Sequence, residues 1–185
     1  LYSRTTSLAW GDINGDGLMD LVEGNADEPN ELFINRGGGS FEWRELSAVA
    51  VNTVCVAWAD YNGDGWLDLA VANLGVGNEL YRNDGSGGLI SEAVEQLTSA
   101  ATDTSWLGWA DFNGDGDVDL LVMNYDQPNE IYVNVGGELQ LNAASNAAAS
   151  RTNGDVSGWS ANLAAWGDVN GDGLLDIVMA SRSMH

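Results

Sequence analysis

Four segments of the sequence place short oxygen-bearing side chains at one fixed spacing, Asp-x-Asn-Gly-Asp-Gly-x-x-Asp. Carboxylates or amides stand at positions one, three, five and nine, and alternate positions of a tight loop can converge on one point. This suits Ca²⁺, which takes six to eight oxygen ligands at roughly 2.3–2.6 Å, better than Mg²⁺, which requires stricter octahedral geometry. Zn²⁺ and Cu²⁺ are disfavoured because the loops contain no Cys or His. The sequence therefore predicts up to four Ca²⁺ ions, one in each loop.

The predicted ligands share one register in all four loops. They are the side chains of positions one, three, five and nine and the backbone carbonyl of position seven, whose side chain varies. In chain order they are Asp12, Asn14, Asp16, Leu18 and Asp20; Asp60, Asn62, Asp64, Trp66 and Asp68; Asp111, Asn113, Asp115, Asp117 and Asp119; and Asp168, Asn170, Asp172, Leu174 and Asp176. Glycine at position six permits the sharp turn that such a loop needs.

Two other interpretations of the motif are less favoured. Asn, Asp and Gly all form turns, so a single copy could be a plain hairpin turn. Four copies that all retain the aspartate at position nine argue against this. An EF-hand starts in the same way but needs Glu at position twelve between two helices. Glu23 stands there in the first copy, Val71, Val122 and Met179 stand there in the others, and the flanks lack helical periodicity.

The acidic composition limits the possible partners. The chain has 28 acidic and 6 basic residues among 185 and a net charge of -22, which repels nucleic acid and anionic membranes. No apolar run reaches the roughly 18 residues of a membrane-spanning helix, so no membrane insertion is expected in this segment. Four bound divalent ions would reduce the net charge to about -14. Without metal the three aspartates of each loop repel one another, so chelation is expected to loosen the fold.

The loops belong to a longer repeat. Their first aspartates are 48, 51 and 57 residues apart, close to the roughly 40 to 50 residues of a propeller blade. The first three copies are followed by Asn30–Asn35, Asn78–Asn83 and Asn129–Asn134, which share the pattern Asn-Glu-apolar-aromatic-x-Asn, and then by glycine-rich turns. In the first copy we expect strands at about residues 7–11, 18–24, 31–35 and 41–46. Four strands in each repeat is the number in a propeller blade.

The predicted fold is all-β. Residues 1–185 form one partial β-propeller of four-stranded antiparallel blades, with the calcium loops between the first and second strands. About three and a half blades are present, at approximately 7–48, 54–98, 105–142 and 162–185, the last incomplete, with an inter-blade insertion at 142–158. Since propellers have typically four to eight blades, the remaining blades are expected from missing sequence or from another chain.

Aromatic and sulfur-containing residues are assigned to packing. Trp10, Trp58, Trp109 and Trp166 precede the loops by two residues in every copy, which favours packing over a ligand-binding platform. Cys55 is the one cysteine and lies in an apolar run, so a buried thiol is expected and an internal disulfide is excluded. The single histidine is the last residue, so a nucleophile and histidine triad within this chain is not expected.

Together, the loop and the Asn-Glu-Leu-Tyr-x-Asn segment resemble the VCBS/FG-GAP repeats of integrin α-like β-propellers. Within that family they are most similar to the branch of cartilage acidic protein and ASPIC/UnbV-type bacterial proteins. The Phe-Gly and Gly-Ala-Pro elements that name the FG-GAP group are absent, which argues against an integrin subunit. The resemblance implies a secreted or cell-surface domain, commonly seven-bladed, whose calcium ligands match the residues above position by position. Its expected role is cell adhesion, ligand recognition or a scaffold beside catalytic domains.

The sequence favours a non-enzymatic calcium-binding module with a protein or glycan ligand and no catalytic residues of its own. The alternative is an accessory or catalytic propeller of a polysaccharide-acting lyase or hydrolase. Outside the loops the only recurring carboxylates are Glu31, Glu79 and Glu130, whose equivalent positions suggest a structural role. A lectin-like variant, with Trp43 or Trp159 stacking on sugar, stays open.

Overall fold

The computed structural model describes residues 4–47, 49–85, 89–97, 102–125, 127–142 and 159–183. All regular elements within these ranges are antiparallel strands, which confirms the all-β prediction. They are β1 (Thr5–Gly11), β2 (Asp20–Glu28), β3 (Glu31–Asn35), β4 (Phe41–Glu45), β5 (Val51–Ala59), β6 (Asp68–Val76), β7 (Glu79–Asn83), β8 (Leu89–Gln96), β9 (Thr102–Ala110), β10 (Asp119–Asn124), β11 (Glu130–Asn134), β12 (Leu139–Leu141), β13 (Trp159–Gly167) and β14 (Asp176–Ser183). Over the same ranges, no helix has the length and hydropathy needed to cross a membrane.

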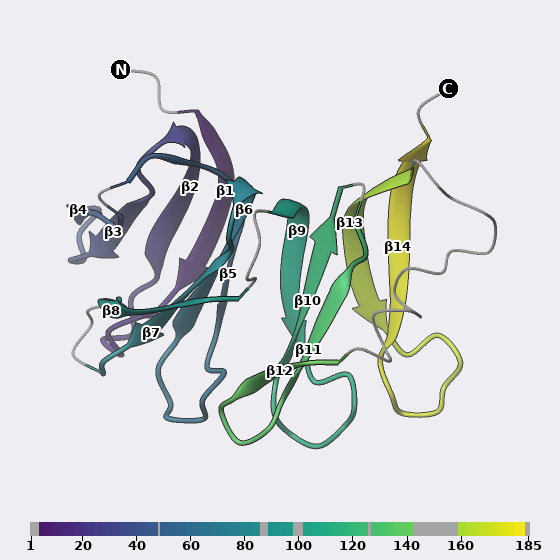
Figure 1. Cartoon of the computed structure of the whole chain (residues 1–185). Helices are drawn as coiled ribbons and strands as arrows, with labels where there is room; N and C mark the ends of the chain where they lie inside the picture. Colours follow the sequence, from purple (N-terminus) through teal and green to yellow (C-terminus); the bar gives the residue numbers. More distant parts are fainter. Residues whose placement is uncertain are drawn as a thin grey trace.

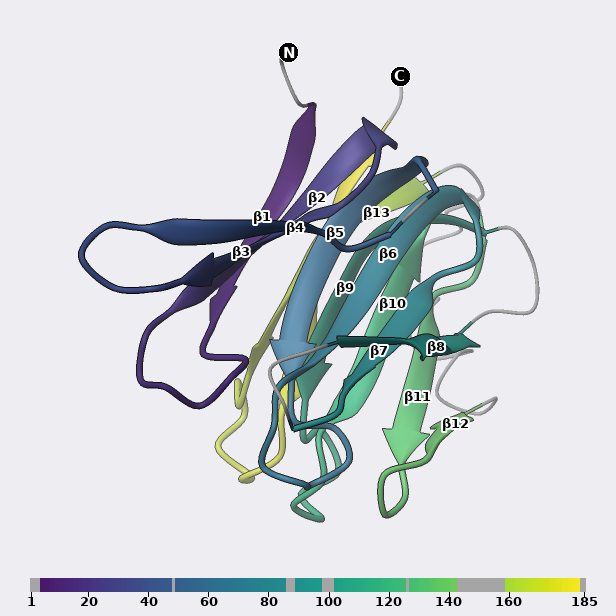
Figure 2. The ribbon, with the colours of Figure 1, turned by 90° about the vertical axis from the view of Figure 1, so that its left-hand side faces the viewer.

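The strands form repeated units. The first three units are the antiparallel meanders β1–β4, β5–β8 and β9–β12, and β13 pairs with β14 in the fourth. Short pairings join neighbouring units, since β2 pairs with β5 and β6 pairs with β9. Figures 1 and 2 show the units side by side along the molecule. The predicted insertion lies outside the described residues except for Asn142, which follows β12.

The strand boundaries of the first unit differ slightly from those expected. The third strand has the predicted bounds, while the second begins at Asp20 and not at Leu18. The cause is local: the Leu18 N–H donates to Asp16 Oδ1 at 2.9 Å, which keeps Leu18 in the loop. The first strand extends back to Thr5 through its pairing with Asn25.

Apolar side chains fill the spaces between the units. One cluster joins Ile13 and Val22 of the first unit to Val56 and Trp58 of the second. Further clusters lie between the second and third units and between the third and fourth. The central strands are covered on both faces, since residues 69–72 of β6 and residues 120–123 of β10 are fully buried. These contacts explain the continuous apolar runs that follow the loops.

The tryptophan before each loop is a packing residue in the middle of the molecule. The indole N–H groups of Trp58 and Trp109 each donate at 3.2 Å to a carbonyl of the preceding unit, those of Ala9 and Ala57. Trp166 Nε1 is buried and makes no hydrogen bond. Trp10 is 55% exposed and contacts Phe41 of its own unit, with ring centroids 6.4 Å apart, so within the described residues it does not make the contact between units that Trp58 and Trp109 make.

A buried polar ladder also links the units. The Asn30 amide donates to Thr53 Oγ1 of the next unit at 2.9 Å, and that hydroxyl donates to Asn73 Oδ1 at 2.9 Å. The same bonds recur one unit later, from Asn78 to Thr104 at 2.9 Å and from Thr104 to Asn124 at 3.0 Å. Buried polar groups are costly unless they are paired, so the ladder fixes the positions of adjacent units.

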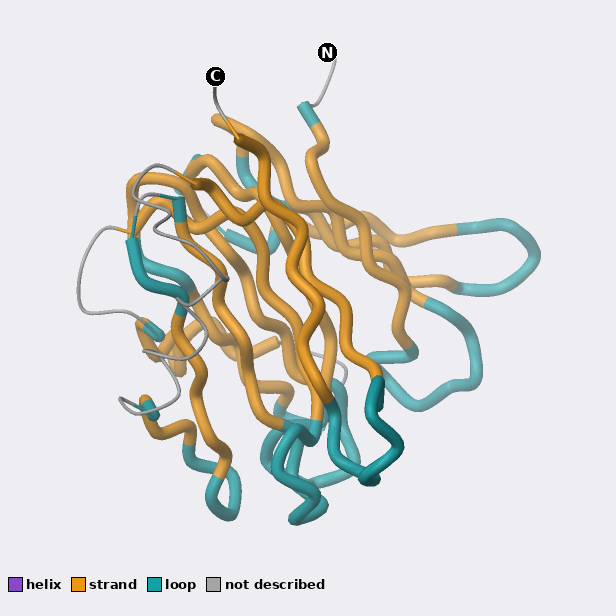
Figure 3. Tube along the Cα trace, turned by 90° about the vertical axis from the view of Figure 1, so that its right-hand side faces the viewer, coloured by secondary structure: helices purple, strands orange, loops and turns teal. Residues whose placement is uncertain are grey.

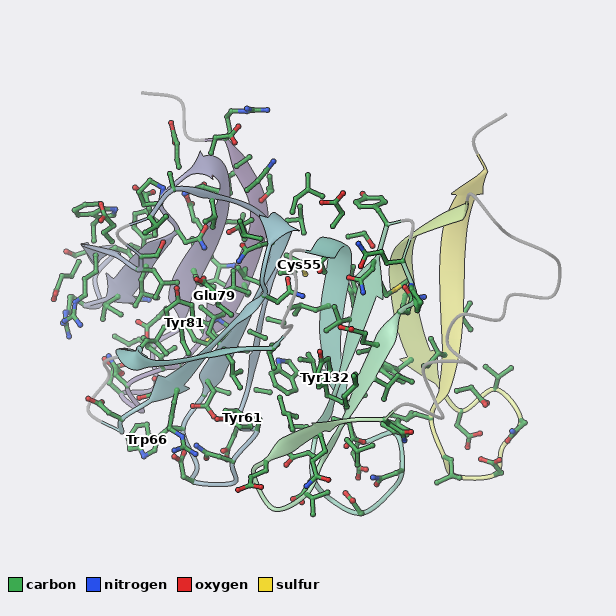
Figure 4. All side chains as sticks on the ribbon, in the orientation of Figure 1. Cys55, Tyr61, Trp66, Glu79, Tyr81 and Tyr132 are labelled. Carbon is green, nitrogen blue, oxygen red and sulfur yellow. The ribbon has the colours of Figure 1, made fainter. Side chains whose placement is uncertain are left out.

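Cys55 lies at the same boundary between units. It is a free thiol, partly buried, and its sulfur donates at 3.6 Å to the Leu107 carbonyl of the third unit. Burial raises the pKa of the thiol, which keeps it protonated and unreactive. Figure 4 shows Cys55 between the second and third units.

Candidate metal sites

The four acidic loops connect β1 to β2, β5 to β6, β9 to β10, and β13 to β14. They protrude at the same end of the molecule, as Figure 3 shows. Each loop therefore joins the first two strands of its unit, as predicted. The aspartates and asparagines of positions one, three and five are exposed or half-buried in all four copies.

The first aspartate organises its loop through both carboxylate oxygens. Asp12 Oδ1 accepts the Asp16 N–H at 3.1 Å, and its Oδ2 accepts the Gly17 N–H at 2.8 Å. The same pair of bonds forms at Asp60, Asp111 and Asp168. The loop backbone thus curls around this carboxylate, and the positive φ of Gly17 (83°) allows the N–H of position six to point inward.

The side chains at positions three and five each accept one hydrogen bond from the loop backbone. Asn14 Oδ1 accepts the Asp16 N–H at 2.9 Å, and Asp16 Oδ1 accepts the Leu18 N–H at 2.9 Å. Both bonds recur in the other three loops. A carboxylate offers about four lone-pair positions, so these bonds leave acceptor capacity for a cation.

The aspartate at position nine lies beneath the loop and is fully buried in the first three copies. Asp20 Oδ2 accepts the Ile13 N–H at 3.1 Å, and its Oδ1 accepts the Asn35 N–H at 2.7 Å. Asp119 makes the equivalent bonds to Phe112 and Asn134. This residue therefore ties the loop to the end of the third strand of its own unit.

In the second copy one of these oxygens has no partner. Asp68 Oδ1 accepts the Asn83 N–H at 2.7 Å, whereas Asp68 Oδ2 is buried without a hydrogen bond. Burial raises the pKa of Asp68 more than the nearby N–H groups of Asn83 and Tyr61 lower it. An unpaired buried carboxylate oxygen is a natural ligand position for a cation.

Burial also sets the electrostatics of position nine. It raises the pKa values of Asp20, Asp68 and Asp119, and that of Asp68 reaches about 6. In each case the aspartates at positions one and five of the same loop raise the pKa further, while backbone N–H groups lower it. The three carboxylates of a loop thus interact, and a divalent cation between them would relieve their repulsion.

Chemically, the loops fit a hard cation, because every predicted side-chain donor is an oxygen. Within the described ranges, however, no three acidic, Cys or His side chains lie close enough together to hold a metal ion. The carboxylates accept hydrogen bonds from loop N–H groups, so these side chains would have to move closer together on metal binding. Residues Leu18, Trp66 and Asp117 of position seven are half-buried and Leu174 is exposed.

The asparagine that ends the Asn-Glu-Leu-Tyr-x-Asn segment recurs in the sequence, but the pattern alone indicates no role for it. In the structure it connects neighbouring loops: the Asn83 N–H bonds Asp68, and its side-chain amide donates at 2.7 Å to the Ile13 carbonyl of the preceding loop. Asn134 repeats this with the Tyr61 carbonyl at 2.6 Å. Its recurrence with fixed spacing was the available signal.

The fold and the loops define a class of protein, an all-β repeat of propeller type with one acidic loop in each unit. A family model for the FG-GAP-like repeat matches three times, at residues 12–71, 60–122 and 111–179. These matches run through more than half of the chain, so the protein belongs to the FG-GAP-like repeat family. The predicted family is confirmed, and the narrower branch stays a prediction.

One solved structure supports the same fold, and a second is similar at a lower score. The chain is similar to a chain in the crystal structure of BBS1N in complex with ARL6DN, soaked with lead, with a TM-score of 0.58, 18% identity, and coverage of 98% of this chain and 52% of that one. It also resembles the V. cholerae biofilm matrix protein Bap1, with a TM-score of 0.48, 18% identity, and coverage of 96% and 28%. The chain thus spans about half of the first structure's chain and less of the second. No curated protein matches the sequence.

Proposed function

We propose that this chain is a calcium-binding, calcium-stabilised part of an extracellular or cell-surface propeller that recognises a protein or glycan without catalysing a reaction. The observation that carries the proposal is the repeated loop. Four copies present the same oxygen donors, and the first three bury an aspartate beneath them. The unpaired Asp68 Oδ2 supports a cation in the second loop. Extracellular modules bind Ca²⁺ with dissociation constants of about 10⁻⁴ to 10⁻³ M, which suits exposed loops of this kind.

Isothermal titration with CaCl₂ tests the proposal. After treatment with EDTA, the wild-type chain should bind up to four Ca²⁺ ions. Asp16→Ala should remove one of them, because it deletes the donor at position five of the first loop. The matched control is Asp27→Ala, which removes an exposed acid paired with Arg4 outside the loops and should leave the stoichiometry unchanged. Absence of binding at about 10 mM Ca²⁺, well above the affinity range of extracellular modules, would rule out the proposal.

A hollow beside the second loop is the candidate site for ligand recognition. Its volume is about 560 Å³, and it is lined by Asn62, Asp64, Trp66, Arg82, Asn83 and Asp84. An indole beside a guanidinium and several carboxylates and amides offers stacking and hydrogen bonding, which is the combination that sugars require. Figure 4 shows Trp66 at the base of the second unit.

Glycan-array binding tests this site with Arg82→Ala, because Arg82 is exposed and lies outside the metal loop. The matched control is Arg44→Ala on the first unit, since Arg44 is also an exposed strand arginine. Loss of a glycan signal in Arg82→Ala alone would support the hollow. Equal signals in both variants would remove it as the recognition site.

We retain the polysaccharide-acting enzyme as the second hypothesis. Two of the three recurring acids outside the loops make structural contacts that support the non-enzymatic proposal. Glu79 accepts the Tyr81 hydroxyl and Glu130 accepts the Tyr132 hydroxyl, each at 3.0 Å. Burial raises the pKa values of both tyrosines above their ordinary range, so their hydroxyls stay protonated. Polysaccharide cleavage that disappears in Glu130→Gln would reverse the order of the two hypotheses.

A further inference from the structure

The second unit departs from the repeat at two positions that line one hollow. At position seven of its loop, Trp66 stands where the first and third units have leucine and aspartate. In its third strand, Arg82 stands where those units have isoleucine and valine. Both residues line the hollow beside the second loop. A structural role shared by the units does not explain them, so among these three units the combination is specific to the second.

Two glycines leave room for the Trp66 indole. A Cβ added at Gly85, in the turn after β7, would lie 2.9 Å from Trp66 Nε1. A Cβ added at Gly15 of the first loop would lie 3.0 Å from Trp66 Cζ3. The ring is therefore seated between the first loop and the turn of its own unit. An aromatic side chain that is held in position before a ligand arrives loses little conformational entropy on binding.

Arg82 carries a charge that no carboxylate neutralises. Its side chain is exposed and makes no ion pair within the part of the chain that the structure describes. Over the same ranges three other arginines each contact a carboxylate: Arg4, Arg36 and Arg44. A free guanidinium in a chain of net charge -22 is available to an anion from outside, and its planar fork matches a carboxylate with two parallel hydrogen bonds.

The hollow lies between units of the same chain. Trp66 is seated against Gly15 of the first unit, and a Cβ added at Gly137 of the third unit would lie 3.3 Å from Asn62 Cα. Neighbouring units therefore flank the hollow on both sides. Its walls do not depend on where the chain begins or ends.

Two predicted calcium ligands also line the hollow, Asn62 and Asp64 of the second loop. Without a cation, the carboxylates of Asp64 and Asp84 in this wall repel an anion. A cation held by the second loop would offset this charge. The predicted ligands come from five residues of the loop, whereas Ca²⁺ takes six to eight oxygens, so an oxygen of a bound molecule can complete its coordination.

We propose that the hollow binds a carboxylate-bearing sugar, such as a uronate residue of an acidic polysaccharide. Arg82 pairs with the carboxylate, Trp66 stacks on the apolar face of the sugar ring, and Ca²⁺ in the second loop strengthens binding. The flat indole favours a sugar ring over an acidic peptide. The inference rests on the proposed recognition function and adds the chemical class of the ligand.

Calorimetric titration of the chain with trigalacturonate, in CaCl₂ and in EDTA, tests the proposal. Arg82→Ile and Trp66→Leu introduce the residues that the first unit carries at these positions, so both variants should fold. Arg82→Ile should weaken binding about tenfold or more, because a charged hydrogen-bonded pair is lost. Trp66→Leu should weaken it about fivefold through the loss of stacking. The matched control Arg44→Ile, at another exposed strand arginine, should bind like wild type.

The ligand has matched controls as well. Methyl-esterified trigalacturonate keeps the sugar rings but lacks the charge, so wild type should bind it weakly and Arg82→Ile should change this little. Triglutamate carries the charge without the rings and should compete poorly. Binding of trigalacturonate should be weaker in EDTA than in CaCl₂, because Asp64 is then uncompensated.

Calcium titration of the same variants separates this inference from the proposed calcium binding. Trp66→Leu keeps the carbonyl of position seven, so both variants should bind as many Ca²⁺ ions as wild type. Loss of trigalacturonate binding with an unchanged number of Ca²⁺ ions supports the inference. A chain that binds no Ca²⁺, yet loses trigalacturonate binding in Arg82→Ile, refutes calcium binding and keeps the uronate site.

Four outcomes would overturn the inference. Wild type could fail to bind trigalacturonate in CaCl₂, or bind its methyl ester equally well. Arg82→Ile could bind trigalacturonate with the wild-type affinity. Triglutamate could compete as well as trigalacturonate, which would make the hollow a site for acidic peptides.

Discussion

Asp68→Asn should remove a pH-dependent loss of stability from the calcium-free protein. Asp68 is fully buried, and burial raises the pKa of its carboxyl group from 3.8 to about 6, with further increases from Asp64 and Asp60. A folded-state pKa above the unfolded value means that the fold favours the neutral acid. Its stabilising contribution is therefore complete below about pH 4 and is lost as the pH rises through about 6. A shift of about 2 units corresponds to about 3 kcal/mol.

The assay is urea unfolding in EDTA at several values between about pH 4 and pH 7. Asparagine resembles the neutral acid in shape and cannot ionise, so the variant should gain about 3 kcal/mol relative to wild type across this range. Ca²⁺ favours the carboxylate, so adding it should abolish the gain. Asp27→Asn, at an exposed acid, should follow wild type at every pH. The reasoning fails if wild type and Asp68→Asn lose stability in parallel in EDTA.

Three further substitutions probe the interfaces and the loops. In Gly24→Ala the new Cβ would lie 2.7 Å from Thr53 Cγ2, so thermal unfolding should show a loss of stability of about 1–3 kcal/mol. The control Gly167→Ala has open space around the new Cβ and should lose little stability. Equal losses in the two variants would contradict this account. Thr104→Val removes the hydroxyl that joins Asn78 to Asn124, so urea unfolding should show a loss of stability of about 1–3 kcal/mol. The control is Thr5→Val, at an exposed threonine. An equal loss in both variants would show that the buried polar ladder contributes little to stability. Gly65 has φ of 91° and open space around it, so Gly65→Ala should reduce stability by about 1–2 kcal/mol through backbone strain alone. The same strain should weaken Ca²⁺ binding at the second loop, as measured by calorimetry. An unchanged Ca²⁺ affinity would show that the strain does not change the positions of the ligand atoms.

The periodic features of the fold could be predicted from the sequence because each depends on local chemistry. The repeat spacing and the alternation around Trp58 and Trp109 led to the strand order, and residues 31–35 became a strand as expected. The boundary at Asp20 was missed because a loop hydrogen bond, and not the apolar pattern, ends the loop. Pattern alone also could not show that Trp10 is exposed, because its surroundings depend on a neighbouring unit.

The polar contacts between units were beyond prediction for a different reason. Thr53 bonds Asn30 and Asn73, which lie 23 and 20 residues away in the sequence, so no local pattern reports the contact. The threonines recur at the same offset from the loop tryptophan, but threonine is common in strands for other reasons. The role of Asn83 was hidden in the same way, because its amide reaches a carbonyl 70 residues earlier.

These long-range contacts connect the candidate metal sites to one another. Asp20 accepts the Ile13 N–H, the Ile13 carbonyl accepts the Asn83 amide, and the Asn83 N–H bonds Asp68. The aspartates beneath the first and second loops are thus separated by a continuous hydrogen-bonded path of two residues. A cation that fixes Asp20 also fixes the Ile13 peptide, and therefore reduces the conformational freedom that the second loop must lose when it binds its own ion. Calcium binding to neighbouring loops should consequently be positively cooperative, and Asn83→Ala should abolish the cooperativity while leaving every predicted ligand in place.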